Sequence, residues 1–239
     1  MSHLSRSIAA LACAAALPAL AGAEDITVVS RVTLSRGAPL TSTQYVGAEK
    51  IRTSDGENDT VVDVAAGRYT VLNHRKKEYY EFTRDEMLAS MQKFEQEMSG
   101  PMGAMIEKMT GGKVGEVEVE KGASRKVAGY DCTAYTFSLG TNMRYEMCAT
   151  QALQLPAAYY YALKGPYSMM GPMAKRFDKV FEEMKKIKGF PLAMNATVEL
   201  MAFKLQMQSE ATEVRKGAIP AAAFQLPAGY TKKRAPFGK

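Results

Sequence analysis

The sequence predicts an α+β fold built on an antiparallel sheet. Short segments in which apolar and polar residues alternate fill the first third of the chain and return near its end, and this alternation is typical of half-buried strands. Two segments with apolar residues three or four positions apart interrupt them and indicate helices. The strands are joined by short turns, whereas parallel strands need crossovers of about a dozen residues or more.

The first strand is predicted over Ile26–Leu34, and Arg36–Pro39 turns the chain after it. Turn signals at Asp55-Gly56 and Ala66-Gly67 separate the strands that follow. These strands are expected around residues 43–53, 60–64, 68–72 and 78–82. Later strands are expected from about residue 114 to 119, 192 to 201 and 203 to 214, with a helical turn near 219–224.

A helix is predicted to begin after Thr83, because Thr83 and Glu86 have the spacing of a capping box. Apolar residues then recur on one face until about residue 110, and most of them are methionines: Met87, Met91, Met98, Met102, Met105 and Met109. The unbranched thioether of methionine adapts to irregular shapes. The stripe therefore indicates either ordinary hydrophobic core or a soft lid that touches a ligand.

A second helical block is predicted near residues 156–188, with one broad apolar face and one charged face. Met170 and Met173 lie on the apolar face and are further candidates for ligand contact. Gly189 is expected to end the helix, because glycine readily adopts the left-handed conformation of a helix C-terminus.

Cys132 and Cys148 are predicted to form a structural disulfide across a hairpin. If residues 139–141 form the loop around Gly140, paired positions sum to 280 and the cysteines face each other. A one-residue adjustment stays open, since glycine is not at the commonest position of a three-residue loop. A redox-active pair is the alternative, but that chemistry prefers a Cys-x-x-Cys spacing at a helix N-terminus.

The same hairpin register separates a polar face from an apolar one. It places Ala134 opposite Glu146 on the polar face and Tyr135 opposite Tyr145 on the apolar face.

Residues 1–23 are predicted to be a cleaved signal peptide. Arg6 precedes the apolar run Ile8–Leu17, and Ala21 and Ala23 give the small-x-small cleavage pattern before Glu24. The mature chain is then one domain over residues 24–239, soluble and periplasmic or secreted, where thiols oxidise. Lipid anchoring at Cys13 is the alternative, although most of the apolar run follows that cysteine.

Removal of the signal leaves His74 as the only histidine, together with two cysteines. This argues against a zinc site and, because His74 is expected in a basic surface turn, against a catalytic triad. Asp63, Glu78 and Glu81 form no recognisable acid–base pair, so the sequence predicts no enzyme, cofactor or metal site.

The formal charge of +6 becomes +5 once Arg6 is removed. Part of the excess lies in Lys185–Lys188 and Lys232–Arg234, which are either solvated faces or a surface attracted to an anionic membrane. Nucleic acid is not an expected partner, because no aromatic–basic recognition motif is present.

Three segments carry a resemblance to a known family: Tyr69–Tyr80, Ala128–Tyr135 and Ala218–Tyr230. Together they resemble exported bacterial proteins classified as a domain of unknown function, which are related in fold to the Lol-type periplasmic lipoprotein carriers. The resemblance covers most of residues 25–231. It implies a strongly curved antiparallel β-sheet, a half-barrel, with helices packed on its concave side. It transfers no ligand contact.

These observations predict an exported, non-catalytic binding or carrier-like module for a hydrophobic ligand such as a lipid, an acyl chain or a lipoprotein. One alternative is copper(I) binding by Met102-x-x-Met105 and Met170-x-x-Met173, because thioethers select Cu(I). A structural envelope protein without a ligand is another alternative.

Overall fold

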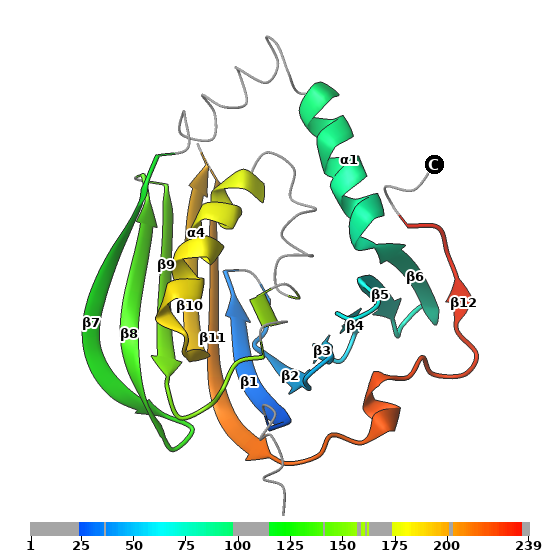
Figure 1. The fold of residues 1–239 in the computed structure, drawn as a ribbon, viewed down its shortest axis with the longest axis horizontal. Coiled ribbons are helices and arrows are strands. Elements are labelled where there is room, and N and C mark those ends of the chain that lie inside the picture. Colours follow the sequence, from blue (N-terminus) through cyan, green and yellow to red (C-terminus); the bar gives the residue numbers. More distant parts are fainter. Residues whose placement is uncertain are drawn as a thin grey trace, which may run out of the picture.

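The computed structural model describes residues 24–35, 37–97, 115–140, 142–156, 159–160, 162, 174–200 and 203–235. In this part of the chain, one sheet of 12 strands curves without closing (Figure 1). Neighbouring strands are antiparallel except for the last strand, which pairs in parallel with β6. Two α-helices of 14 residues each accompany the sheet, so the described fold is more dominated by strands than the predicted α+β class.

The N-terminal half of the sheet is a meander of six strands: β1 (Ile26–Leu34), β2 (Leu40–Val46), β3 (Lys50–Ser54), β4 (Asn58–Asp63), β5 (Arg68–Asn73) and β6 (Glu78–Thr83). The single strand predicted around residues 43–53 is wrong, because β2 and β3 are separate. Gly47 turns the chain between them, and its N–H donates a hydrogen bond to the carbonyl oxygen of Lys50 at 2.9 Å.

The C-terminal half contains β7 (Val117–Val127), β8 (Tyr130–Leu139), β9 (Met143–Thr150), β10 (Phe190–Leu200) and β11 (Phe203–Lys216). The two halves meet where β1 pairs with β11, so the strand order is β6-β5-β4-β3-β2-β1-β11-β10-β9-β8-β7. Strand β7 runs well beyond the segment predicted to end near residue 119. It forms one edge of the sheet, and most of its side chains are exposed.

The predicted disulfide between Cys132 and Cys148 is confirmed, with the two Cα atoms 5.4 Å apart. The predicted register is wrong by two residues: paired positions sum to 282, so Ala134 lies opposite Cys148 and Thr136 opposite Glu146. Leu139 pairs with Met143, which moves the loop to residues 140–142. A shift of two preserves the two faces of the hairpin, because side chains alternate with a period of two. The cysteines are therefore diagonal neighbours.

Helix α1 (Arg84–Glu97) begins at the predicted capping box. The Thr83 N–H donates to Glu86 Oε2 at 2.7 Å, and the Glu86 N–H donates to Thr83 Oγ1 at 3.2 Å. These two bonds satisfy backbone donors that the first helical turn leaves without partners. Helix α1 lies against β6, at one end of the sheet (Figure 1).

Helix α4 (Ala174–Ile187) lies on the inner side of the curved sheet, against β7 and β8 (Figure 1). The helix ends just before Gly189, as predicted, although the residue in the left-handed conformation is Lys188, with φ of 52°. Gly189 is needed for close packing: a Cβ there would lie 3.0 Å from the Cβ of Ala149. None of the described helices is long and apolar enough to span a membrane.

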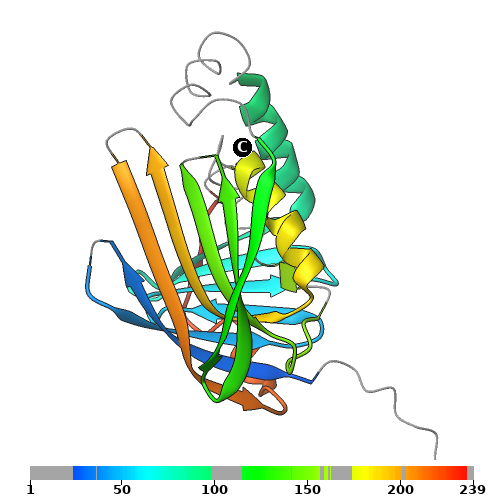
Figure 2. The same cartoon turned by 90° about the vertical axis from the view of Figure 1, so that its left-hand side faces the viewer.

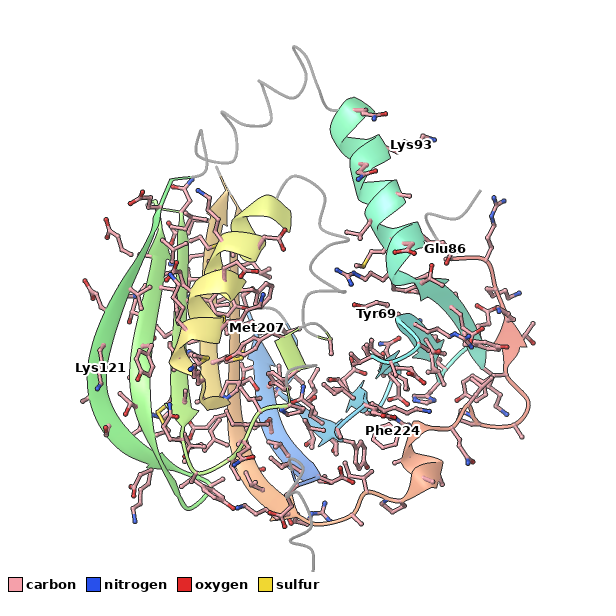
Figure 3. The ribbon with its side chains drawn as sticks, viewed as in Figure 1. Tyr69, Glu86, Lys93, Lys121, Met207 and Phe224 are labelled. Atoms are coloured by element: carbon pink, nitrogen blue, oxygen red, sulfur yellow. A yellow bond between two sulfur atoms is a disulfide. The ribbon has the colours of Figure 1, made fainter. Side chains whose placement is uncertain are left out.

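The C-terminal segment crosses the outer face of β3–β6. It contains the predicted helical turn as a 3-10 helix, η2 (Ala221–Phe224), and a short strand, β12 (Thr231–Lys232). Strand β12 extends the sheet beyond β6, where the Thr231 N–H donates to the Lys77 carbonyl oxygen at 2.9 Å. In Figure 3, Phe224 of η2 lies outside the curve, whereas Tyr69 lies inside it.

Candidate functional site

One row of buried apolar side chains crosses the inner face of the N-terminal half of the sheet. The strand registers place its members directly opposite one another from β1 to β6: Ile26, Val46, Ile51, Val62, Tyr69 and Phe82. The rings of Tyr69 and Phe82 are stacked, with centroids 5.0 Å apart. This half of the sheet therefore has a continuous apolar inner surface.

A second apolar row crosses the inner face of the C-terminal half. It runs from β8 to β11 through Phe137, Tyr145, Ala196 and Met207, which are opposite one another in register. Helix α4 buries Val180, Phe181 and Met184 on the same side of the sheet. The inner face is therefore apolar at both ends, and α4 covers the end formed by β7 and β8.

Two tyrosines connect the two halves of the inner face. Tyr159 OH donates to Gln44 Oε1 on β2 at 3.3 Å, and the Tyr159 ring packs against Phe190, with centroids 5.4 Å apart. Tyr160 OH donates to the carbonyl oxygen of Met184 in α4 at 3.1 Å. Burial raises the pKa of Tyr160 to about 12, because a low-dielectric surrounding disfavours the phenolate.

The raised pKa of Tyr160 predicts a loss of stability at alkaline pH. Because the ordinary pKa of tyrosine is about 10, the folded state holds this proton more tightly than the unfolded state. The contribution of this proton to the free energy of unfolding is fully present below pH 10 and is lost as the pH rises toward 12. Between pH 9 and 11.5, we expect the free energy of unfolding in urea to fall by about 1–2 kcal/mol more in the wild type than in Tyr160→Phe. An equal fall in both proteins would contradict this assignment.

Several apolar side chains on the inner face are only half buried. They come from both halves of the sheet: Val71 and Tyr80 from β5 and β6, and Met194, Leu205 and Met207 from β10 and β11. Figure 3 shows Met207 inside the curve, on the same side as Tyr69. These side chains leave apolar surface exposed on the inner face of both halves of the sheet. An apolar ligand that covered this surface would remove it from water, which is favourable.

None of these five side chains was a candidate in the sequence analysis. The signal that identifies the β11 pair is the alternation Lys204-Leu205-Gln206-Met207-Gln208, in which every second residue is apolar. The alternation predicts which side chains share a face, but it does not predict whether a helix covers them.

Most of the predicted ligand-binding methionines lie outside the described residues, namely Met98, Met102, Met105, Met109, Met170 and Met173. Met91 lies in the described part of α1. Met87 also lies in α1, and its side chain is 5% exposed and belongs to the hydrophobic core. The structure therefore places Met87 beside the inner face, and its contact with a ligand stays a prediction.

His74 was predicted to be a surface residue in a turn. The turn is confirmed, but the side chain does not project freely into solvent. It lies in the β5–β6 turn, but both of its ring nitrogens have partners: Nε2 is 2.7 Å from Asp59 Oδ2, and Nδ1 bonds to the hydroxyl of Tyr230. Asp59 is 1% exposed and is also ion-paired with Arg52. Arg52 in turn donates to the carbonyl oxygen of Ala223.

This buried network fastens the C-terminal segment to the outer face of β3 and β4. Asp59 Oδ1 and Arg52 Nε have no hydrogen-bond partner among the described residues. The described residues contain no group of three or more His, Cys, Asp or Glu side chains placed to hold a metal ion. Because Arg52 and His74 bond to Ala223 and Tyr230, the network around Asp59 links the C-terminal segment to the sheet.

Two further predicted features can be placed only in part. Ala21 and Ala23 of the predicted cleavage site lie outside the described residues, whereas Glu24 is exposed, 3.8 Å from Lys216. In the basic segments, Lys185 and Lys186 pair with Glu182 and Glu183 one turn earlier in α4. Lys232 and Lys233 similarly pair with Glu81 and Glu78 of β6.

Comparison with known proteins gives one family and several structures. A family model described as a domain of unknown function, DUF4412, matches residues 45–230. No curated protein matches the sequence.

Solved structures with a similar course of the chain include an uncharacterized conserved protein from Thermus thermophilus. It is 8% identical with a TM-score of 0.47, and the match covers 89% of this chain and 91% of that one. MucB in the MucA/MucB complex of Pseudomonas aeruginosa is 15% identical with a TM-score of 0.43, over 86% of this chain and 56% of that one. This chain thus spans little more than half of the MucB chain.

A LolA superfamily protein from Nitrosomonas europaea is 8% identical, with a TM-score of 0.29 over 85% of this chain and 90% of that one. All three TM-scores lie below 0.5, and no ligand or activity is transferred from these proteins.

Proposed function

The chain belongs to the DUF4412 family, whose model matches most of its length, and from this premise we propose that it is an exported, non-catalytic module that binds a hydrophobic ligand. The ligand, a lipid, an acyl chain or the acyl part of a lipoprotein, would lie on the inner face of the curved sheet. The half-buried apolar side chains that both halves of the sheet place on this face carry the proposal.

Three features support the proposal. The inner-face rows are made of large apolar and aromatic side chains, which release the most free energy when they are covered. Met194 and Met207 add flexible thioethers that adapt to ligands of irregular shape. The disulfide between Cys132 and Cys148 and the signal-like N-terminus both fit an oxidising, exported environment.

The non-catalytic part of the proposal rests on His74. A histidine that acts as a general base needs a ring nitrogen that can reach the substrate. Asp59 and Tyr230 occupy both ring nitrogens of His74.

A pair of neighbouring residues on β11 provides the test. Met207 points to the inner face, whereas Gln206 is exposed on the outer face, so Met207→Lys and Gln206→Lys add the same charge one residue apart on opposite faces. With the fluorescent fatty acid parinaric acid as probe, Met207→Lys should raise the Kd by about tenfold or more, because an ammonium group is costly beside an acyl chain. Gln206→Lys should leave it within about twofold.

Circular dichroism and thermal unfolding of both variants show whether either has lost its fold. Mass spectrometry of protein purified from its native envelope adds an independent readout, because it reports any lipid that copurifies. The proposal is wrong if no fatty acid binds and no lipid copurifies, or if the two folded variants bind the probe equally well.

A further inference from the structure

A polar cleft lies on the opposite side of the sheet from the proposed hydrophobic site. It has a volume of about 710 Å³ and is lined by residues of β1 and β7–β11. Ligand cavities in proteins commonly measure about 300–1,000 Å³, so the cleft has the size of a small-molecule site. Of its lining residues, Met194 also belongs to the proposed hydrophobic site and Cys148 to the disulfide, whereas its polar side chains belong neither to that site nor to the network around Asp59.

The cleft exists because the edge of the sheet bends outward. A β-bulge interrupts the pairing of β7 between Lys121 and Ser124, and bulges bend and twist the strand that carries them. The second half of β7 thereby approaches β11, and Arg125 forms an ion pair with Glu210 at 2.7 Å across the three intervening strands. Figure 2 shows the lower ends of β7 and β8 bending toward β11.

The floor of the cleft is made of small side chains. Cys148 and Ala193 are buried at its base, and Ala134 lies beside them on β8. Because none of these side chains extends far from the sheet, they leave depth for a ligand. The disulfide fixes one side of this floor, since Cys148 is bonded to Cys132.

One residue that lines the cleft has a buried polar atom without a partner. Asn195 Nδ2 donates to Glu146 Oε2 at 3.2 Å, whereas Asn195 Oδ1 is buried and has no hydrogen-bond partner among the described residues. The neighbouring carboxylate fixes the orientation of the amide, because only the NH₂ group can donate to it. Asn195 Oδ1 is therefore an acceptor that a ligand N–H or O–H group would satisfy.

The rim provides a complementary cation. Arg125 is neutralised by Glu210, and Glu146 accepts from Arg144 at 2.9 Å. Arg31 is exposed at the rim and has no ion-pair partner among the described residues. Its guanidinium group is suited to a carboxylate, which it can bind with two parallel hydrogen bonds.

We propose that this cleft binds a small polar ligand that carries a carboxylate and, about 10 Å away, an N–H or O–H donor. Arg31 binds the carboxylate and Asn195 Oδ1 accepts from the donor. The separation follows from the sheet: Arg31 is opposite Glu210 and Glu210 is opposite Ala193, so Arg31 and β10 are two strand spacings apart. A tripeptide spans about this distance when extended, and so does a short acidic oligosaccharide.

Nuclear magnetic resonance of ¹⁵N-labelled protein tests the proposal and distinguishes the two sources. The probes are tri-alanine, tri-alanine amide and trigalacturonate. Binding should shift the side-chain amide signal of Asn195, and it should require the carboxylate, so that tri-alanine amide binds at least about tenfold more weakly than tri-alanine. A response to tri-alanine identifies a peptide ligand, and a response to trigalacturonate alone identifies an acidic sugar.

Two variants on different strands remove the two proposed contacts. Arg31→Gln and Asn195→Leu should each weaken binding of the responding probe by about tenfold or more. Arg215→Gln and Thr197→Val are matched controls, because they remove a charge and a hydroxyl from strands of the same sheet outside the cleft. Both controls should bind normally, as should Met207→Lys, whose change lies on the inner face.

The proposal is overturned if neither carboxylate probe shifts the Asn195 signal, or if the amide binds as well as the acid. It is also overturned if folded Arg31→Gln binds like the wild type. The exposed position of Arg31 keeps this last variant informative even if Asn195→Leu fails to fold.

Discussion

Replacing Asp59 by alanine is expected to lower the free energy of unfolding by about 3–5 kcal/mol, the cost of removing one partner from a buried ion pair. Asp59 is 1% exposed, and both Arg52 and His74 bond to its Oδ2 atom. Without the carboxylate, the Arg52 guanidinium group stays largely buried beside an empty space. Denaturant unfolding followed by circular dichroism measures the loss.

The same substitution should also loosen the C-terminal segment. Arg52 donates a hydrogen bond to the Ala223 carbonyl oxygen, and His74 Nδ1 bonds to the Tyr230 hydroxyl. Asp59 orients the side chains of Arg52 and His74. Limited trypsin digestion should therefore cut after Lys232 and Lys233 faster in Asp59→Ala than in the wild type, because local opening exposes these bonds.

Asp63→Ala is a matched control on the same strand. Asp63 also pairs with a cation, Lys50 at 3.3 Å, but both side chains are substantially exposed. The backbone N–H of Ala66 and the Lys50 ammonium group lower the pKa of Asp63. Surface ion pairs contribute little, so we expect a loss of about 1 kcal/mol. If Asp59→Ala costs no more than Asp63→Ala, the network around Asp59 does not stabilise the fold as described.

Removing the disulfide should have the second largest effect. Cys132 and Cys148 are 16 residues apart in sequence, and both side chains are buried. Closing a loop of about 15 residues in the unfolded chain is worth about 3 kcal/mol, so Cys132→Ala/Cys148→Ala should lose about 2–4 kcal/mol. The loss should appear as a lower urea midpoint.

Reduction provides the control for this prediction. Dithiothreitol should lower the urea midpoint of the wild type to about that of the double variant and should leave the double variant unchanged. A wild-type midpoint that is the same with and without the reductant would show that the bond contributes nothing to stability. Because Cys148 lines the polar cleft, the double variant also tests whether the floor keeps its shape.

Local patterns predicted the strands and faces of this fold well. The alternation over Ile26–Leu34 matches β1 at both ends, and the capping box at Thr83 and Glu86 marks the start of α1. In the cysteine hairpin, the faces were correct although the register was not. Alternation determines the face of each side chain, whereas the register depends on which loop position Gly140 occupies. Gly140 is the first loop residue, with φ of 59°.

Contacts between distant segments were not predictable from the same patterns. His74 and Tyr230 are 156 residues apart in sequence, and nothing near either residue indicates that they meet. The polar cleft depends on a bulge in β7 that brings Arg125 to Glu210. Gly122 lies within this bulge, and a glycine inside a strand is a signal of a bulge, but it does not indicate which strand the bend approaches. For the proposed ligand-binding face, the methionines at helical spacing led to a prediction on the helices, whereas the described half-buried apolar surface comes from the strands.

The pairing of β1 with β11 has a consequence for the order of folding. The first strand of the sheet lies beside a strand that ends at residue 216, so the junction of the two halves closes only after nearly the whole chain has been synthesised. Each half is a meander of mostly local pairings, which form early, whereas a junction across so long a loop forms late. Until then β1 is an open edge that can pair with other chains. A chaperone that shields residues 26–34 should therefore raise the yield of refolding more than one that binds β6.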